Sequence, residues 1–259
     1  MEVEMERASR TRPATISEEE WRLRLQLAAC YRLVDWFGWS DAIANHISLR
    51  LPGAEKAFLI NPFGLHYCEV TASNLLKINT AGDKLDESIH PVNKAGFVIH
   101  SAIHEARDDA HCVLHTHTTA GMAVACKVGG LRNDNVYSFK LHGKVAYHDF
   151  EGVTTDREEQ PRLVANLGDK KLLILRNHGL LAMGRTVSQA FYAYWTLQRA
   201  CEVQVLADSM AGPTLAIPEA AFKAAPTRRT GGANYHAKNA DLVFAALLRK
   251  ARISFEEVV

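Results

Sequence analysis

The segment CVLHTH, residues 112–117, constrains the fold most, because it joins an apolar strand to two histidines spaced i and i+2. Side chains at i and i+2 of a strand project to the same face of a sheet. His115 and His117 are therefore expected to point together, with Thr116 on the opposite face. Two adjacent imidazoles make a poor apolar contact and a good pair of metal ligands.

A third histidine has a similar setting. His178 lies in RNHG, after the apolar strand expected at 172–176, and Gly179 is expected to permit a sharp turn there. Three neutral imidazoles and an open position form a common catalytic zinc site. A single histidine is more often a hydrogen-bonded core or surface residue, and the sequence alone does not place His178 beside the other two.

The remainder of the chain alternates predicted strands and helices. Ser17 and Glu20 fit a capping box at the start of the first long helix. Further strands are expected at 46–51, 57–61, 75–79, 144–150 and 172–176, and helices at 17–39, 93–107, 118–127, 155–168 and 186–210. This alternation predicts a single α/β or α+β domain in which helices pack on a sheet.

The predicted boundaries divide the chain into three parts. Residues 1–15 are charged, lack apolar periodicity and are expected to form a flexible arm. The domain is predicted to occupy 16–211, followed by a partly helical C-terminal extension at 212–259. The 259 residues, of which 47% are hydrophobic, are enough for one large core.

Composition argues against several classes of partner. Lys and Arg total 30 and Asp and Glu 29, so the charge of +1 gives no reason to expect nucleic acid or an anionic membrane. The five cysteines form no CxxC motif and are expected to be reduced, mostly core thiols. Without a secretory h-region or an apolar run of roughly 20 residues, the protein is expected to be soluble and cytoplasmic.

Several long segments resemble the class II aldolase/adducin family. HTHT after an apolar strand, RNHGLLAMG, ANHISLR and NKAGFVIHSAIHEARDDAHCVLHTHT carry the resemblance, which extends from about Trp21 to Asp208. The segments INPFG, EVTASNL and RNHG are most similar to the adducin-head branch. The resemblance implies a central, mostly antiparallel sheet flanked by helices. It also implies a divalent metal, usually zinc, on His115, His117 and His178, and a homotetramer with sites between subunits.

The sequence departs from the sugar-phosphate aldolases of this family at the acid/base position. Those enzymes carry Ser-Ser-Glu or Ser-Ser-Asp, with the acid nineteen residues before the first metal histidine, and Gly96 stands there in this chain. A retro-aldol reaction needs general acid–base groups, which contribute roughly 10²–10⁴-fold in rate. Decarboxylation needs fewer acid–base groups, because carbon dioxide leaves without prior proton abstraction. Some relatives in the family are decarboxylases.

Three positions are candidates for substrate binding. Asn45 is retained from the family's Gly-Asn pair, although Ala44 precedes it, and Gly64 is retained with Phe63 before it. The alanine and the phenylalanine both disfavour a phosphate cradle. Lys94 offers a charge for an acidic substrate, although a solvated lysine in the first turn of a helix is an equally good interpretation.

The proton donor is not assigned by the sequence. Tyr137 falls near the position where the family often supplies a tyrosine from a neighbouring subunit, and an ordinary interface or core tyrosine is the alternative. His148 is a second candidate, against a local hydrogen-bonded turn with Asp149. His100 and His104 are spaced i and i+4, and a buried, hydrogen-bonded role is expected for His100.

Two functions follow from these observations. The first is a metal-dependent lyase that cleaves a carbon–carbon bond through a metal-stabilised enolate, on a small oxygenated carbonyl or carboxylate substrate. The second is a non-catalytic oligomerisation or interaction domain like the adducin head. The sequence leaves open whether the chain catalyses aldol cleavage, decarboxylation or no reaction.

Overall fold

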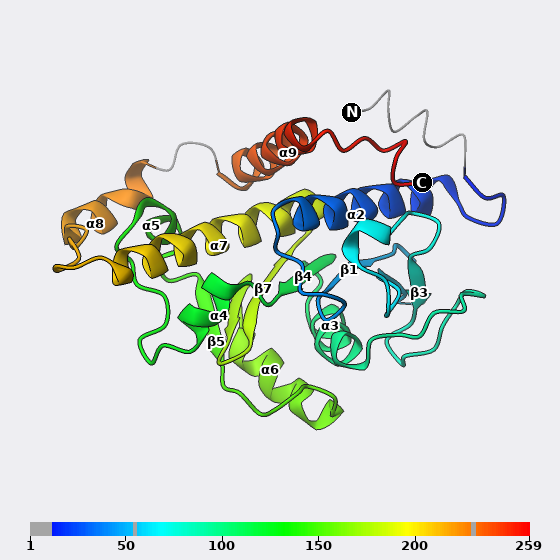
Figure 1. The fold of residues 1–259 in the computed structure, drawn as a ribbon, viewed down its shortest axis with the longest axis horizontal. Coiled ribbons are helices and arrows are strands. Elements are labelled where there is room, and N and C mark those ends of the chain that lie inside the picture. The colour runs from blue at the N-terminus through cyan, green and yellow to red at the C-terminus, as the bar shows by residue number, and fades with distance from the viewer. Residues whose placement is uncertain (1–11, 54–55, 229–231) are drawn as a thin grey trace.

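A seven-stranded sheet with helices on both faces forms the centre of the molecule (Figure 1). The computed structural model describes residues 12–53, 56–228 and 232–259. The strands are β1 (His46–Arg50), β2 (Phe58–Ile60), β3 (Leu76–Ile78), β4 (Cys112–Thr116), β5 (Val145–His148), β6 (Leu172–Leu175) and β7 (Gly179–Gly184). Their order across the sheet is β3-β2-β1-β4-β7-β6-β5, and only the β5–β6 pair is parallel. This arrangement confirms the predicted single domain with a mostly antiparallel sheet.

The helices cover the two faces unequally. They are α2 (Glu18–Trp36), α3 (Lys94–Ala106), α4 (Thr119–Ala125), α5 (Val136–Leu141), α6 (Gln160–Leu167), α7 (Val187–Ser209), α8 (Glu219–Arg228) and α9 (Gly232–Ala251), with short 3₁₀ turns η2 (Tyr67–Glu69) and η3 (Arg157–Glu159). The larger core cluster includes buried residues of α2, α7 and α9, and a smaller cluster joins α3 and α6 to the other face.

Local sequence signals account for several of these boundaries. The Ser17 side chain accepts a hydrogen bond from the Glu20 backbone N–H at 3.1 Å, which is one half of the predicted capping box. The Glu20 carboxylate accepts from Arg24 and Lys77 instead of completing the box. Gly168 ends α6 with φ of +55°, a conformation that glycine adopts without a steric penalty. In β4, Leu114 contributes to the larger core cluster and Val113 to the smaller one, because successive side chains alternate between faces.

The elements that the sequence patterns do not predict include strand β7 and helix α5. Strand β7 follows His178 directly, within a segment that the pattern ends in a turn, and α5 is a helix of only six residues. The predicted extension 212–259 contains α8 and α9, and α9 packs against α7 and α2. Phe244 and Leu248 of α9 belong to the larger core cluster. Most of the predicted arm 1–15 lies outside the described residues.

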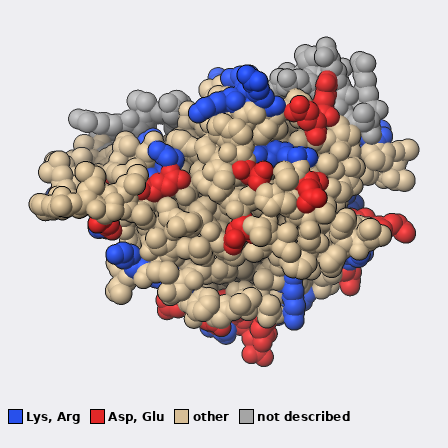
Figure 2. All heavy atoms as spheres, in the orientation of Figure 1, with Lys and Arg blue, Asp and Glu red and all other residues tan. Residues whose placement is uncertain are grey.

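The molecular surface carries mixed charge. On the face drawn in Figure 2, acidic and basic side chains are interspersed, in keeping with the balanced composition. Within the described part of the chain, no helix combines the length and apolarity needed to cross a membrane.

Candidate metal centre

His115, His117 and His178 come together where β4, β6 and β7 meet. The first two side chains leave the end of β4, and His178 lies in the turn that joins β6 to β7. The three ring centroids are 4.7 to 4.8 Å apart, and one ring nitrogen from each residue lies within 4.8 Å of the others. The sheet supplies this proximity, since β4 pairs directly with β7, in register His115 to Leu181.

Hydrogen bonds fix the tautomers of the two β4 histidines. Nδ1 of His115 donates to the carbonyl oxygen of Leu180 at 2.9 Å, and Nδ1 of His117 donates to Oδ2 of Asp41 at 3.1 Å. Each neutral ring therefore has an unprotonated Nε2. The two Nε2 atoms lie 2.9 Å apart. Two lone pairs at this separation need a cation or a proton between them, so the donor set fits a divalent metal ion.

The environment keeps the imidazoles of His115 and His178 neutral. Burial lowers the pKa of His115 well below its usual value, and His178, His46 and His117 lower it further. Burial also lowers the pKa of His178 to about 4, assisted by His117 and His148. At neutral pH the rings of His115 and His178 therefore present lone pairs rather than charge, as metal ligands must.

Gly179 has a different role from the one predicted. The residue with positive φ in this turn is Asn177, at +56°. A Cβ at position 179 would lie 2.6 Å from the carbonyl oxygen of Thr116 and 3.2 Å from the rings of both His115 and His117. Glycine is thus required because the backbone passes directly against the two histidines.

The predicted substrate-binding residues lie in three settings. Asn45 precedes β1, and both its side-chain oxygen and nitrogen are buried without a hydrogen-bond partner. Such a group is costly unless something satisfies it, so Asn45 is the strongest polar candidate for ligand contact. Lys94 is exposed at the start of α3, and Gly64 lies in an exposed loop with φ of +103°.

Gly96, at the position of the missing acid, packs against His46. A Cβ on Gly96 would lie 2.8 Å from the imidazole of His46, and the ring centroid of His46 is 4.9 Å from that of His115. His46 therefore occupies the space beside Gly96 of α3. The sequence patterns do not identify His46 as a site residue.

His46 is the end of a buried hydrogen-bonded chain. Nδ1 of His104 donates to the carbonyl oxygen of Ala110 at 2.8 Å, so its Nε2 accepts from Ser48 Oγ at 2.7 Å. The Ser48 oxygen in turn accepts from Nδ1 of His100, whose Nε2 accepts from Nδ1 of His46 at 2.7 Å. Nε2 of His46 is left as an acceptor, and His100 has the buried, hydrogen-bonded role that was expected.

The two candidate proton donors are held by other groups. Both ring nitrogens of His148 are engaged, Nε2 with Glu159 at 3.0 Å and Nδ1 with Asn166 at 2.8 Å. The ring of Tyr137 packs edge-on against Trp195 at 5.6 Å. Among the contacts of the described residues, none joins Tyr137 to the three histidines.

Sequence reasoning missed Asp41 and His46 as parts of this centre. Asp41 lies 76 residues before His117, in the connection between α2 and β1, and no spacing rule links the two. His46 carries a weak signal, because it opens a strand immediately after Asn45.

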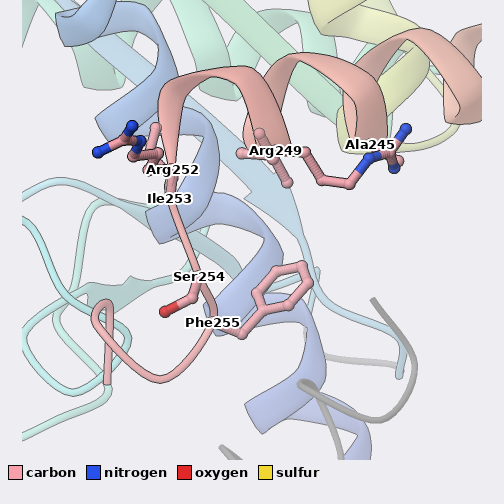
Figure 3. A pocket seen from close by; sticks show the side chains of 7 residues that line it. Ala245, Arg249, Arg252, Ile253, Ser254 and Phe255 are labelled. Atoms are coloured by element: carbon pink, nitrogen blue, oxygen red, sulfur yellow. The ribbon is translucent and has the colours of Figure 1, made fainter.

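A separate hollow lies at the C-terminal end of the chain. It has a volume of about 280 Å³ and is lined by Ala245, Leu248, Arg249, Arg252, Ile253, Ser254 and Phe255 (Figure 3). The guanidinium groups of Arg249 and Arg252 extend away from each other, so they do not converge on a common anion. The hollow shares no residue with the histidine cluster.

Comparison with known sequences identifies relatives across most of the chain. A family model described as "Class II Aldolase and Adducin N-terminal domain" matches residues 25–205. The "Putative aldolase class 2 protein PA3430" of Pseudomonas aeruginosa is 50% identical over 205 residues, which cover 79% of each chain. Alpha-adducin of Rattus norvegicus is 50% identical over 193 residues, which cover 73% of this chain and 26% of adducin.

Solved structures with the same fold cover nearly the whole chain. An aldolase II superfamily protein from Pseudomonas syringae is 41% identical with a TM-score of 0.86, over 94% of this chain and 98% of that one. L-fuculose 1-phosphate aldolase from Glaciozyma antarctica PI12 is 30% identical with a TM-score of 0.78, over 96% of this chain and 98% of that one.

Proposed function

Since the chain belongs to the class II aldolase and adducin family, we propose that it is a metal-dependent lyase. It cleaves a carbon–carbon bond in a small oxygenated carbonyl or carboxylate compound. The observation that carries this proposal is the pair of unprotonated Nε2 atoms of His115 and His117, 2.9 Å apart, with His178 beside them.

The three histidines would hold a divalent ion, for which zinc is the first candidate. When bound, such an ion supplies Lewis acidity, which polarises a carbonyl and stabilises the negative charge of an enolate. Leu180 and Asp41 hold two of the rings in the ligating tautomer, and Gly179 lets the turn bring the third ring close. The site is thus organised before an ion arrives.

The surrounding residues suggest how a substrate is held. The unpartnered amide of Asn45 can donate to a substrate oxygen, and Lys94 can attract a carboxylate from the first turn of α3. With Gly96 in place of an acid, this segment supplies no base for a retro-aldol step. The same residues serve a decarboxylation, which requires only that the carbanion be protonated after carbon dioxide leaves. Tyr137 is a candidate for that protonation if a neighbouring subunit brings it to the site. His148 is the second candidate, but it would first have to release Glu159 or Asn166.

Metal analysis tests the ligand set. Purified tag-free protein and a His115→Ala variant are compared by elemental analysis, with His90→Ala as the matched control, since the hydrogen bonds described for His90 involve only its main chain. We expect the wild type and the control to retain metal that the His115→Ala protein lacks. Equal metal contents would refute the ligand set. Screening of β-keto acids and hydroxy-ketones for cleavage then tests the reaction.

The 50% identity with alpha-adducin favours a second candidate function. In that case the chain is a non-catalytic oligomerisation or interaction domain. A well-folded oligomer that takes up no added zinc at the three histidines, and cleaves none of the screened compounds, would support it over the lyase.

We further propose that the chain acts as a homo-oligomer, with a tetramer as the specific expectation. Exposed apolar side chains, among them Trp36, Ile43 and Phe63, supply surface that association would cover. Size-exclusion chromatography with light scattering measures the mass of the particle in solution directly. The mass of a monomer would contradict this proposal.

A further inference from the structure

A second group of metal-ligating side chains lies outside the histidine cluster, where the end of α2 meets η2. We propose that Asp35, His66 and Cys68 form a second divalent-metal site, suited to a borderline ion such as Zn²⁺ or Co²⁺. In Figure 1 this is the region where the cyan turn lies against α2, and the two elements are in contact. The proposal does not depend on the lyase function.

The donor atoms converge on one point. Nδ1 of His66 lies 3.3 Å from Sγ of Cys68 and 3.5 Å from Oδ1 of Asp35. One donor atom from each of the three residues lies within 4.8 Å of the other two. Nitrogen, sulfur and oxygen from three side chains form a mixed donor set of the kind that zinc binds, with positions left for solvent.

The same three residue types could instead form a nucleophilic triad, and the geometry argues against that. In a triad the cysteine and the carboxylate face opposite nitrogens of the histidine, so that a proton passes across the ring. In this cluster both Cys68 and Asp35 face Nδ1, whereas Nε2 faces Ser40 Oγ at 3.5 Å. Convergence on one nitrogen is the arrangement of ligands around a common ion.

Neighbouring groups orient the imidazole as they do in metal sites. The Ser40 hydroxyl donates to Oδ1 of Asp35 at 2.8 Å, which leaves its oxygen to accept from Nε2–H of His66. This tautomer keeps the lone pair on Nδ1, where it accepts from the Cys68 backbone N–H at 3.4 Å. A bound ion would replace this long hydrogen bond and use the same lone pair. The backbone also holds His66, because it is the N-cap of η2 and its N–H donates to Glu69 at 2.8 Å.

The site is accessible to metal from solvent. The side chains of His66 and Asp35 are 38% and 27% exposed, and Cys68 is also exposed. Cys30, Cys112 and Cys201 are buried, so Cys68 and Cys126 are the accessible thiols. Cys126 belongs to no group of metal-ligating side chains found among the described residues, which makes it the matched control.

Cobalt spectroscopy tests the site in the full-length, reduced, metal-free protein. Addition of Co²⁺ should produce thiolate-to-cobalt charge-transfer absorption in the wild type and in Cys126→Ser, and the band should be lost in Cys68→Ser and His66→Ala. The His115→Ala variant should keep the band, so failure of the histidine centre and failure of this site are distinguishable. Circular dichroism confirms that each variant is folded.

Zinc stoichiometry gives the complementary measurement. We expect Cys68→Ser to bind about one zinc ion per chain fewer than the wild type, with the Cys126→Ser content unchanged. Absence of a thiolate band in the wild type, or a band and zinc content that survive in Cys68→Ser, would overturn the proposal.

Discussion

Substitution of Gly179 by alanine should damage the histidine centre without removing any ligand. The added methyl group would lie 2.6 Å from the Thr116 carbonyl oxygen and 3.2 Å from the rings of His115 and His117. The first contact is with backbone inside the sheet and cannot be relieved by a side-chain rotation, so the turn that carries His178 must shift.

The size of the effect follows from the cost of overpacking. One extra methyl group in a well-packed interior costs about 1–3 kcal/mol. If the metal-bound arrangement carries this strain, the dissociation constant for zinc rises by about 5- to 150-fold, at about 1.4 kcal/mol per factor of ten. Without a bound ion the turn can shift and relieve part of this strain, so the metal-free protein should be destabilised by a smaller amount.

Competition with a chromophoric chelator measures the zinc affinity, and urea unfolding measures the stability. Gly129→Ala is the matched control, since its Cβ would have no neighbour within 4 Å and its φ is not positive. Unchanged zinc affinity in Gly179→Ala, with the control also unchanged, would refute the view that the turn must pass against the two histidines.

Three further outcomes are expected. Burial lowers the pKa of His104 to about 4. Between about pH 6.5 and pH 4, His104 is therefore protonated in the unfolded chain and neutral in the folded chain. The stability this residue gives is present above pH 6.5 and is lost as the pH falls toward 4. Measured by urea unfolding, the free energy of unfolding should therefore fall by about 2 kcal/mol less in His104→Gln than in the wild type between about pH 7.5 and about pH 5. Equal falls in the two proteins would contradict this. Gly96→Ala should be destabilised by about 1–3 kcal/mol, because its Cβ would lie 2.8 Å from the His46 ring, and thermal unfolding measures this. Asp41→Asn removes the carboxylate that orients His117 and should weaken zinc binding about 10- to 100-fold in the chelator assay.

The fold could be predicted largely from local patterns. Helix α2 begins where Ser17 and Glu20 indicate, and the apolar runs at 46–51 and 112–117 form β1 and β4. Strand β7 was not predicted, because GLLAMG follows His178 directly and does not alternate between apolar and polar residues. The strand is buried along its whole length. Helix α5 is too short to show a helical period.

The C-terminal region shows why a weakly patterned segment is hard to interpret. Only the later part of α9 contains an evident apolar run, so the sequence indicated an appended extension. In the structure Phe244 and Leu248 are buried against the same core as Trp21. This packing depends on contacts with α7 and α2, which lie far from α9 in the chain, and no local period can report such contacts.

Only part of the candidate centre could be predicted from the sequence. The pairing of His115 and His117 follows from the two-residue period of a strand, which is a local rule. The approach of His178 depends on β7 lying between β4 and β6, which is a property of sheet order. Asp41 reaches His117 from a connection with no regular structure, so its role could be found only in three dimensions.

Gly96 and His46 are best understood as one feature. Any side chain at position 96 would meet the His46 ring, and that ring is fixed by the hydrogen-bonded chain through His100 and Ser48 to His104. An acid on α3 would therefore require both a displaced histidine and broken buried hydrogen bonds. A single substitution at Gly96 would not supply a working acid, because the neutral imidazole of His46 occupies that space beside His115. Within the proposed lyase function, we therefore expect a reaction that needs no carboxylate from α3, such as decarboxylation, and the substrate screen decides between it and retro-aldol cleavage.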